Sequence, residues 1–185
     1  KGPGIDLFRK VEQALGWKQV IAEDLGYVTD SVRQLVHDSG FPGMKVLEFA
    51  FDSRDSGCAN DYLPHNYPEN SVAYTGTHDN ETIVGWWKSI TVKERKLARD
   101  YLCDNWTPDK DLHKCFISLV MRSSAKLCVI PMQDYMGLDN SSRMNQPSTV
   151  GKNWKWRIRK RELTVKLQKE IHGIALRYGR MNWSD

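Results

Sequence analysis

Residues 72–81 have the sequence Val-Ala-Tyr-Thr-Gly-Thr-His-Asp-Asn-Glu. The first four residues form a short apolar run that is typical of a buried strand, and polar and charged side chains follow it at once. In parallel α/β folds the catalytic side chains gather where the strands end. This stretch therefore predicts a strand whose carboxyl end carries His78 and Asp79 as candidate functional residues.

The sequence on either side alternates helical patterns with further short apolar runs. Strands are expected at residues 20–22, 43–51, 72–75 and 127–131, and helices at 5–15, 29–38, 81–89, 92–103, 112–124 and 160–178. Residues 133–156 are rich in Asn, Ser, Gly and Pro, so we expect an irregular segment there. Four strands alternating with helices predict a parallel α/β sheet, either open and doubly wound or part of a (β/α)₈ barrel. No glycine-rich phosphate motif follows any of these strands, so a nucleotide-binding version is not supported.

Composition excludes several classes of protein. The 185 residues are 40% hydrophobic, which is enough for one compact core, and the formal charge of +4 is too small to imply nucleic acid by itself. No apolar run approaches the length of about 20 residues that a membrane helix needs, and the first six residues, Lys1 to Asp6, lack the apolar core expected of a signal peptide. The chain does not begin with Met, which is consistent with its having been cut from a longer protein.

The four cysteines are far apart in the sequence and form no CxxC pair. This spacing predicts neither a zinc site nor a disulfide framework. We expect reduced thiols in a cytosolic protein, at Cys58, Cys103, Cys115 and Cys128.

Carboxylates follow two of the expected strands. Glu23 and Asp24 come after the first, and Asp79 after the third. Carboxylates at neighbouring strand ends can meet in one pocket, where one with a raised pKa donates a proton and an ionised one stabilises positive charge, as glycoside chemistry requires. The same residue types also serve at helix N-termini. We favour helix capping for Asp24, and the spacing alone leaves both interpretations open for Glu23 and Asp79.

His78 could be a catalytic base, a metal ligand or a hydrogen-bond donor to substrate. The other histidines are scattered over different elements, so a metal site is not expected. There is no GxSxG motif for a Ser-His-Asp triad, and no cysteine has the context of a nucleophile. No cofactor is indicated.

Tryptophans and a basic run leave two further questions open. Trp86, Trp87, Trp154 and Trp156 could stack on sugar rings or pack in the core. The basic run at residues 154–161 could hold a phosphate backbone. We favour instead the solvated face of a terminal helix whose apolar positions pack inward, namely Leu163, Val165, Leu167, Ile171 and Ile174.

Several blocks of sequence, in order, carry a resemblance to a known family. The blocks are Ile21–Gly26, Phe41–Leu47, Leu63–Asn70, Tyr74–Asn80 and Arg143–Asn145. In this order they resemble the 4-α-glucanotransferases of glycoside hydrolase family 77, the amylomaltases or disproportionating enzymes. The resemblance extends over essentially the whole chain, to the Asn-Trp-x-Trp-Arg signature at residues 153–157.

The resemblance implies a (β/α)₈ barrel and a retaining double displacement on maltooligosaccharides without a cofactor. By this resemblance Glu23 matches the general acid/base and Asp79 matches the carboxylate that stabilises the transition state. His78 matches the histidine that lies beside this carboxylate and binds the sugar. By the same resemblance Asn145 lies in a substrate-contacting loop. The loop at residues 64–68 is expected to border the acceptor side, and a bacterial cytosol is the implied location. Ser148 stands where the family often has glycine, which puts the backbone of that loop in question.

The family's nucleophile, an aspartate in an Arg-x-Asp-His block, has no counterpart in this sequence. We therefore expect residues 1–185 to be the C-terminal portion of the catalytic barrel, about strands five to eight, with the N-terminal half that holds the nucleophile absent. Such a chain is expected to be inactive alone and to self-associate through unpaired strand edges. A catalytically inert α-glucan-binding module is the alternative, and binding of nucleic acid by the basic run is the least supported reading.

Overall fold

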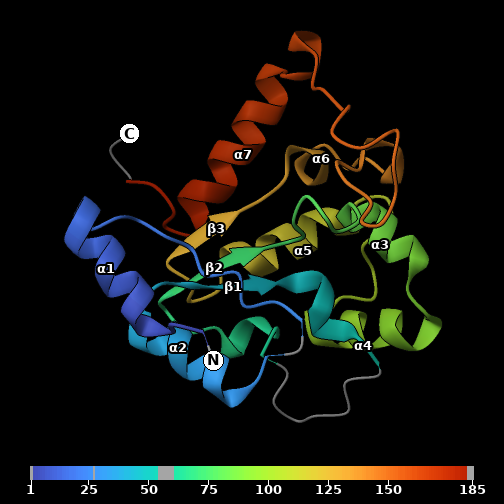
Figure 1. Ribbon diagram of the computed structural model, residues 1–185. Coiled ribbons are helices and arrows are strands. Elements are labelled where there is room, and N and C mark those ends of the chain that lie inside the picture. The colour runs from blue at the N-terminus through green and yellow to red at the C-terminus, as the bar shows by residue number, and fades with distance from the viewer. Residues whose placement is uncertain (1, 27, 54–60, 183–185) are drawn as a thin grey trace.

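The computed structural model of the chain describes residues 2–26, 28–53 and 61–182. A parallel sheet of three strands in the order β1-β2-β3 lies at its centre (Figure 1). The strands are β1 (Gly43–Val46), β2 (Ser71–Tyr74) and β3 (Leu127–Val129). Val46 lies opposite Tyr74, and Tyr74 opposite Val129, so the three strands end level with one another. Their carboxyl ends therefore meet at one edge of the sheet.

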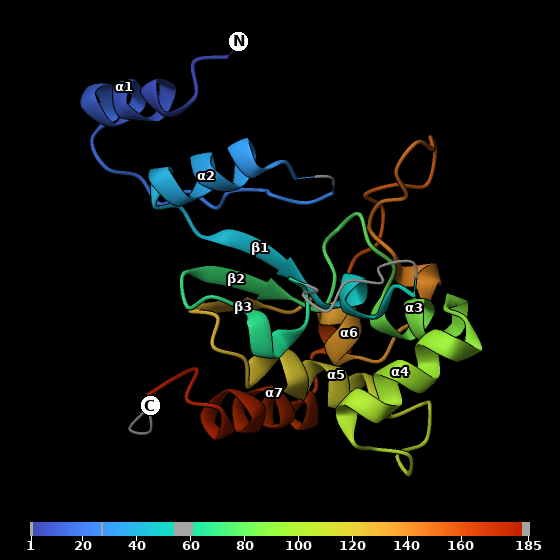
Figure 2. The same ribbon diagram turned by 90° about the horizontal axis from the view of Figure 1, so that it is seen from below.

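Helices surround this sheet on two sides. They are α1 (Ile5–Leu15), α2 (Asp30–Ser39), α3 (Ile83–Ser89), α4 (Val92–Leu102), α5 (Leu112–Met121), α6 (Met132–Tyr135) and α7 (Val165–Arg177). Single 3₁₀ turns are η1 (Leu47–Phe51), η2 (Pro64–Asn66), η3 (Asn140–Ser142) and η4 (Lys160–Glu162). Figure 2 shows α1 and α2 beyond the β1 side of the sheet, and α5 and α7 on the β3 side. None of the helices in the described part of the chain combines the length and the apolar character that crossing a bilayer requires.

The core lies between the sheet and helices α3 to α5. Trp86 and Phe116 meet edge to face with ring centroids 5.3 Å apart, and Phe51 and Trp87 pack against them. Trp86 and Trp87 are both buried, because α3 turns this face toward α5. These two tryptophans are therefore core residues.

Two expected strands differ from the structure. Residues 20–22 form no strand, and Ala22 alone makes an isolated parallel bridge to Gly43. The strand expected at 43–51 ends at Val46 and continues as η1. Leu47, Glu48, Ala50 and Phe51 are all buried in this turn, and a strand covered on both faces would bury the same positions, so their burial does not distinguish the two structures.

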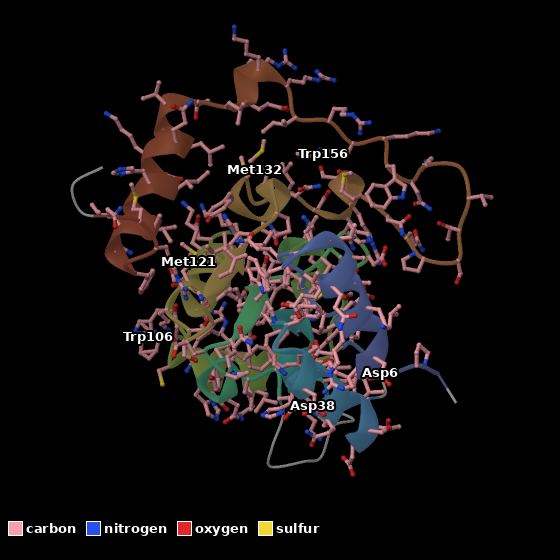
Figure 3. All side chains as sticks on the ribbon, turned by 60° about the vertical axis from the view of Figure 1, so that its left-hand side comes forward. Asp6, Asp38, Trp106, Met121, Met132 and Trp156 are labelled. Atoms are coloured by element: carbon pink, nitrogen blue, oxygen red, sulfur yellow. The ribbon has the colours of Figure 1, made fainter. Side chains whose placement is uncertain are left out.

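The C-terminal third also departs from expectation. The helix expected at 160–178 is split, because η4 ends at Glu162 and α7 begins at Val165 with Thr164 as its N-cap. The inward packing expected for Leu163 and Val165 is wrong, because both side chains are exposed. The basic run therefore lies on an extended segment and on η4. Figure 3 shows Trp156 within this long segment between α6 and α7, at the opposite end of the view from Asp38 at the end of α2.

The segment expected to be irregular, residues 133–156, is mostly so, but it contains most of α6 and all of η3. Cys103, Cys115 and Cys128 are free thiols, as expected. Cys58 lies outside the described residues.

Candidate functional site

A cavity of about 630 Å³ opens at the carboxyl edge of the sheet. Its lining comes from the residues that follow each strand end. Glu23 follows the Ala22 bridge, Phe49 follows β1, and His78 and Asp79 follow β2. The structure thus brings Glu23, His78 and Asp79 to one cavity although 55 residues separate the first two in the sequence.

The turn after β2 presents His78 and Asp79 to this cavity. The Asn80 Oδ1 atom accepts hydrogen bonds from the Thr77 backbone N–H at 2.9 Å and from the Thr77 hydroxyl at 2.7 Å. The Thr77 hydroxyl oxygen in turn accepts from the Asp79 backbone N–H at 3.3 Å. Side-chain bonds of this kind stabilise a tight turn, so the position of Asp79 depends on Thr77 and Asn80.

Asp79 is the centre of a polar cluster. The Asn145 Nδ2 group donates to the Asp79 Oδ1 atom at 2.5 Å, and the His78 Nε2 atom lies 3.3 Å from the same oxygen. The Arg143 guanidinium donates to the Asp79 carbonyl oxygen at 2.6 Å. The side chains of His78 and Asp79 keep exposed fractions of 53% and 48%. Asn145 therefore reaches the site by contacting Asp79, although it does not line the cavity itself.

The segment after η3 folds back onto this turn. The backbone N–H of Asn145 donates to the His78 carbonyl at 3.0 Å, and the ring of Trp154 packs on the His78 ring with centroids 5.0 Å apart. Trp154 has φ of 62° and Ser148 has φ of 63°, in the left-handed region that favours glycine. The backbone at position 148 thus has a conformation that suits the glycine often found there in the family, and Ser148 adopts this conformation at a cost in conformational free energy. Trp154, one of the tryptophans with an open role, is a neighbour of His78.

Asp24 fixes the segment that brings Glu23 to the cavity. Its Oδ1 atom accepts from the Met44 backbone N–H at 2.7 Å, and Ala22 N–H donates to the Pro42 carbonyl at 2.9 Å. The capping role expected for Asp24 is therefore wrong, because the N-cap residue of α2 is Thr29. Asp24 instead fixes the segment before α2 to β1 and leaves the neighbouring Glu23 side chain exposed at the cavity.

Two buried acids beneath the turn were not among the predicted site residues. Asp134, on α6, is 1% exposed and accepts from the Thr75 hydroxyl at 2.5 Å and from the Ile83 backbone N–H at 2.8 Å. Burial raises the pKa of Asp134 to about 6. Glu48, on η1, is 7% exposed, and burial together with the nearby Asp134 and Glu81 raises the pKa of its carboxyl well above the ordinary range.

Glu48 lies directly against the turn. A Cβ atom placed on Gly76 would lie 2.7 Å from the Glu48 Oε1 atom, so no larger residue fits at position 76 without a shift. Glu48 also lines a second cavity, of about 420 Å³, together with Phe49, Asp79 and Arg143. The two cavities share Phe49, Asp79 and Asn80, so they adjoin at these residues.

The loop at residues 64–68 is not at the site. It leads into the amino end of β2, and it is held there by a hydrogen bond from the Ser124 hydroxyl to the Tyr67 carbonyl at 2.5 Å. His65 stacks on Tyr101 of α4. The expected position beside the acceptor is therefore wrong for this chain, because the loop lies at the other end of the strands. Among the described residues no group of three or more His, Cys, Asp or Glu side chains is arranged to hold a metal ion.

The fold and the site define an α/β protein with a small parallel sheet and a cavity at its carboxyl edge, on which Glu23, His78 and Asp79 converge. The sequence profile of the 4-alpha-glucanotransferases, glycoside hydrolase family 77, matches residues 1–164. The chain therefore belongs to this family.

Individual relatives agree with the profile. The chain is 41% identical to the 4-alpha-glucanotransferase of Clostridium butyricum over 181 residues, which is 97% of this chain and 36% of that enzyme. It is 41% identical to the one of Thermus thermophilus over 182 residues, 96% of this chain and 35% of that enzyme. The structure of amylomaltase from Streptococcus agalactiae in complex with acarbose superposes with a TM-score of 0.89 at 37% identity, over 98% of this chain and 36% of that one. The chain thus spans about a third of the length of these relatives.

Proposed function

We propose that the chain is the C-terminal portion, about strands five to eight, of the catalytic (β/α)₈ barrel of a 4-α-glucanotransferase. The whole enzyme would transfer α-1,4-glucan segments between maltooligosaccharides by a retaining double displacement. The observation that carries this proposal is the convergence of Glu23, His78 and Asp79 on one cavity at the carboxyl edge of parallel strands. In this proposal the Ala22 bridge and strands β1, β2 and β3 take the places of four successive barrel strands.

Glu23 would act as the general acid/base. It would protonate the leaving glycosidic oxygen and then take the proton of the acceptor hydroxyl. A general acid of this kind needs a raised pKa, which burial supplies. Glu23 is exposed in this chain, so we propose that another part of the longer protein covers it.

Asp79 would stabilise the positive charge that develops on the sugar ring. An oxocarbenium-like transition state gains from a nearby carboxylate and from hydrogen bonds that strengthen as charge develops. His78 and Asn145 contact the Oδ1 atom of Asp79, and they would orient it and bind sugar hydroxyls. Trp154 supports the ring of His78 from the side.

The nucleophile would come from the part of the protein that precedes this chain. Without a covalent glycosyl-enzyme the acid/base has no intermediate to resolve, so we expect little or no transfer by the 185 residues alone. The proposed setting is a bacterial cytosol, without a cofactor.

Incubation with maltotriose tests this proposal. We expect the isolated chain to release neither glucose nor longer oligomers, and we expect both products when the N-terminal portion of a related enzyme is supplied in trans. Glu23→Gln in the reconstituted enzyme should abolish both products, and Glu12→Gln on the exposed face of α1 should leave them unchanged. Full transfer by the Glu23→Gln variant would overturn the acid/base role.

An α-glucan-binding module without activity is the second candidate, because His78 and Trp154 present half-exposed rings beside the cavity. It predicts saturable binding of maltoheptaose by the chain and no products even after complementation. Isothermal titration calorimetry with the isolated chain measures this binding. Product formation on reconstitution separates the two candidates, since it excludes the second function.

A further inference from the structure

Glu48 is an acid in an environment that does not support a negative charge. It is 7% exposed, and its Oε1 atom has no hydrogen-bond partner among the described residues. A carboxylate in such a place would be left buried with half of its charge unsatisfied, which is far more costly than a neutral carboxylic acid.

The charged groups around Glu48 add to this effect. Asp134 on α6 and Glu81 before α3 oppose a charge on Glu48, and Arg143 after η3 favours one. The Arg143 guanidinium is already engaged with the carbonyl oxygens of Asp79 and Asn145, at 2.6 and 2.9 Å. Asp52, Asp79 and Glu94 line the same cavity of about 420 Å³ and add further negative charge on its other walls. The balance of these groups favours a proton on Glu48.

Glu48 is connected to the turn that presents His78 and Asp79. The Asn80 amide interacts with the Glu48 carboxyl, and although this hydrogen bond by itself favours the charged form and lowers the pKa of Glu48, burial outweighs it. Its Oδ1 atom is occupied by Thr77, which leaves the Nδ2 group to donate toward Glu48. Through Thr77 the same amide fixes the backbone N–H of Asp79.

We propose that Glu48 is a positioning residue that acts as a neutral carboxylic acid, orienting Asn80 and through it the turn that carries His78 and Asp79. Loss of its proton would place a charge between Asp134 and Glu81 and displace the turn, so Glu48 sets the alkaline limit of sugar binding. The link to sugar binding rests on the proposed function, whereas the link between Glu48 and the turn does not.

The experiment is a pH titration of the 185-residue chain followed by NMR, with glutamate side chains and backbone amides labelled. Wild type is compared with Glu48→Gln, which keeps the shape and the acceptor oxygen but cannot ionise. The matched control is Glu12→Gln, the same substitution on the exposed face of α1. We expect one carboxyl resonance, missing only from Glu48→Gln, to titrate well above the ordinary range of a glutamate.

The amides of His78 and Asp79 are the readout of positioning. They should shift with the same midpoint as this carboxyl in wild type and in Glu12→Gln, and this shift should be absent from Glu48→Gln. The proposal is overturned if the missing resonance titrates in the ordinary range, or if the two amides titrate identically in Glu48→Gln and wild type.

Binding of maltoheptaose over the same pH range connects the switch to the function. Affinity of the wild type should fall about fivefold as Glu48 ionises, the loss expected for one misplaced hydrogen-bonding group, and Glu48→Gln should hold its affinity. A pH-independent affinity in wild type would overturn the alkaline limit. Absence of binding by the isolated chain at every pH would overturn the link between Glu48 and sugar binding, whereas the maltotriose test decides the proposed function and the amide shifts decide whether Glu48 positions the turn.

Discussion

The carboxyl group of Asp134 joins three elements at a single point. From α6 it accepts a hydrogen bond from Thr75 at the end of β2 and another from Ile83 at the start of α3. It therefore fixes both ends of the segment that carries the candidate catalytic turn. The raised pKa of about 6 is the consequence of enclosing this group, and it makes the stability of the fold depend on pH.

Asp134→Asn tests this dependence. The folded-state pKa of about 6 lies above the ordinary value of 3.8, so the contribution of Asp134 to stability is complete below pH 3.8 and is lost as the pH rises through 6. Asparagine does not ionise, so the variant does not suffer this loss. From pH 4 to pH 7 we expect the unfolding free energy of the variant to rise, relative to that of the wild type, by roughly 2–3 kcal/mol. Urea denaturation measures the change. Asp6→Asn, on an exposed side chain of α1, serves as the control, and an equal change there would contradict the prediction.

At the scale of residues, the sequence indicated the exposed residues of the candidate site and missed the buried acids beneath them. Glu23, His78 and Asp79 could be found because polar residues directly after an apolar run stand out. Glu48 and Asp134 could not, because the burial of an acid depends on which elements pack over it. The helix-capping role expected for Asp24 is wrong for a similar reason, because only the tertiary fold places the Met44 N–H within reach of the Asp24 carboxylate.

The helix α4 begins with a reciprocal pair of caps. Thr91 accepts from Glu94 N–H at 3.3 Å, and the Glu94 carboxylate accepts from Thr91 N–H at 2.8 Å and from Ser53 N–H at 3.0 Å. These backbone bonds lower the pKa of Glu94 to about 2. Its stabilising contribution is therefore present above the ordinary pKa and is lost only as the pH falls toward 2.

Thr91→Ala should lower the unfolding free energy by about 1 kcal/mol, because two N-terminal donors of α4 lose their arrangement. Thr29→Ala is a matched comparison, since Thr29 is the N-cap residue of α2 but its side chain makes no capping hydrogen bond. We expect less than half of the effect there. Urea titrations of both variants at pH 7 give the two values, and equal losses would show that the Thr91 cap contributes nothing specific.

Elements with strong local signals were the ones predicted well. The helix at residues 5–15 coincides with α1, and α2 ends before Gly40, which has φ of 67°. The strand expected at 20–22 failed because a strand exists only with a partner, and Ala22 alone reaches Gly43. The strand after Gly43 was predicted too long because an apolar run of nine residues does not distinguish a strand from a buried helical turn.

The whole molecule leaves apolar surface uncovered at both ends of its sheet. Trp17, after α1, is 69% exposed, and helices α1, α2 and α7 contain no fully buried residue. On the far side Leu127 and Val129 of β3 are exposed, and β3 pairs only with β2 among the described residues. Surfaces of this kind favour association.

Sedimentation velocity should therefore show self-association of the chain that increases with concentration. Leu127→Lys places a charge on the β3 edge and should shift the population toward monomer. Val92→Lys is the control, since Val92 is 82% exposed at the start of α4, away from that edge. A monomer at all concentrations, or an equal response of both variants, would contradict the role of the β3 edge.

At this scale the sequence predicted the α/β class, which is confirmed, and left the closure of the sheet undetermined. Periodicity reports which faces of each element are apolar, and it does not report how many strands complete the sheet. In the described part of the chain the sheet has three strands and one isolated bridge, and the chain spans about a third of the length of its relatives.

The close approach of Gly76 to Glu48 has a consequence for how this sequence can evolve. Since the space for a Cβ atom at position 76 is occupied by the end of the Glu48 side chain, the two positions form one steric unit. A side chain gained at 76 must displace the end of the Glu48 side chain, whereas position 48 can shorten while Gly76 remains. A lineage with a shorter residue at 48 should therefore tolerate a side chain at 76 better than one that keeps its buried acid.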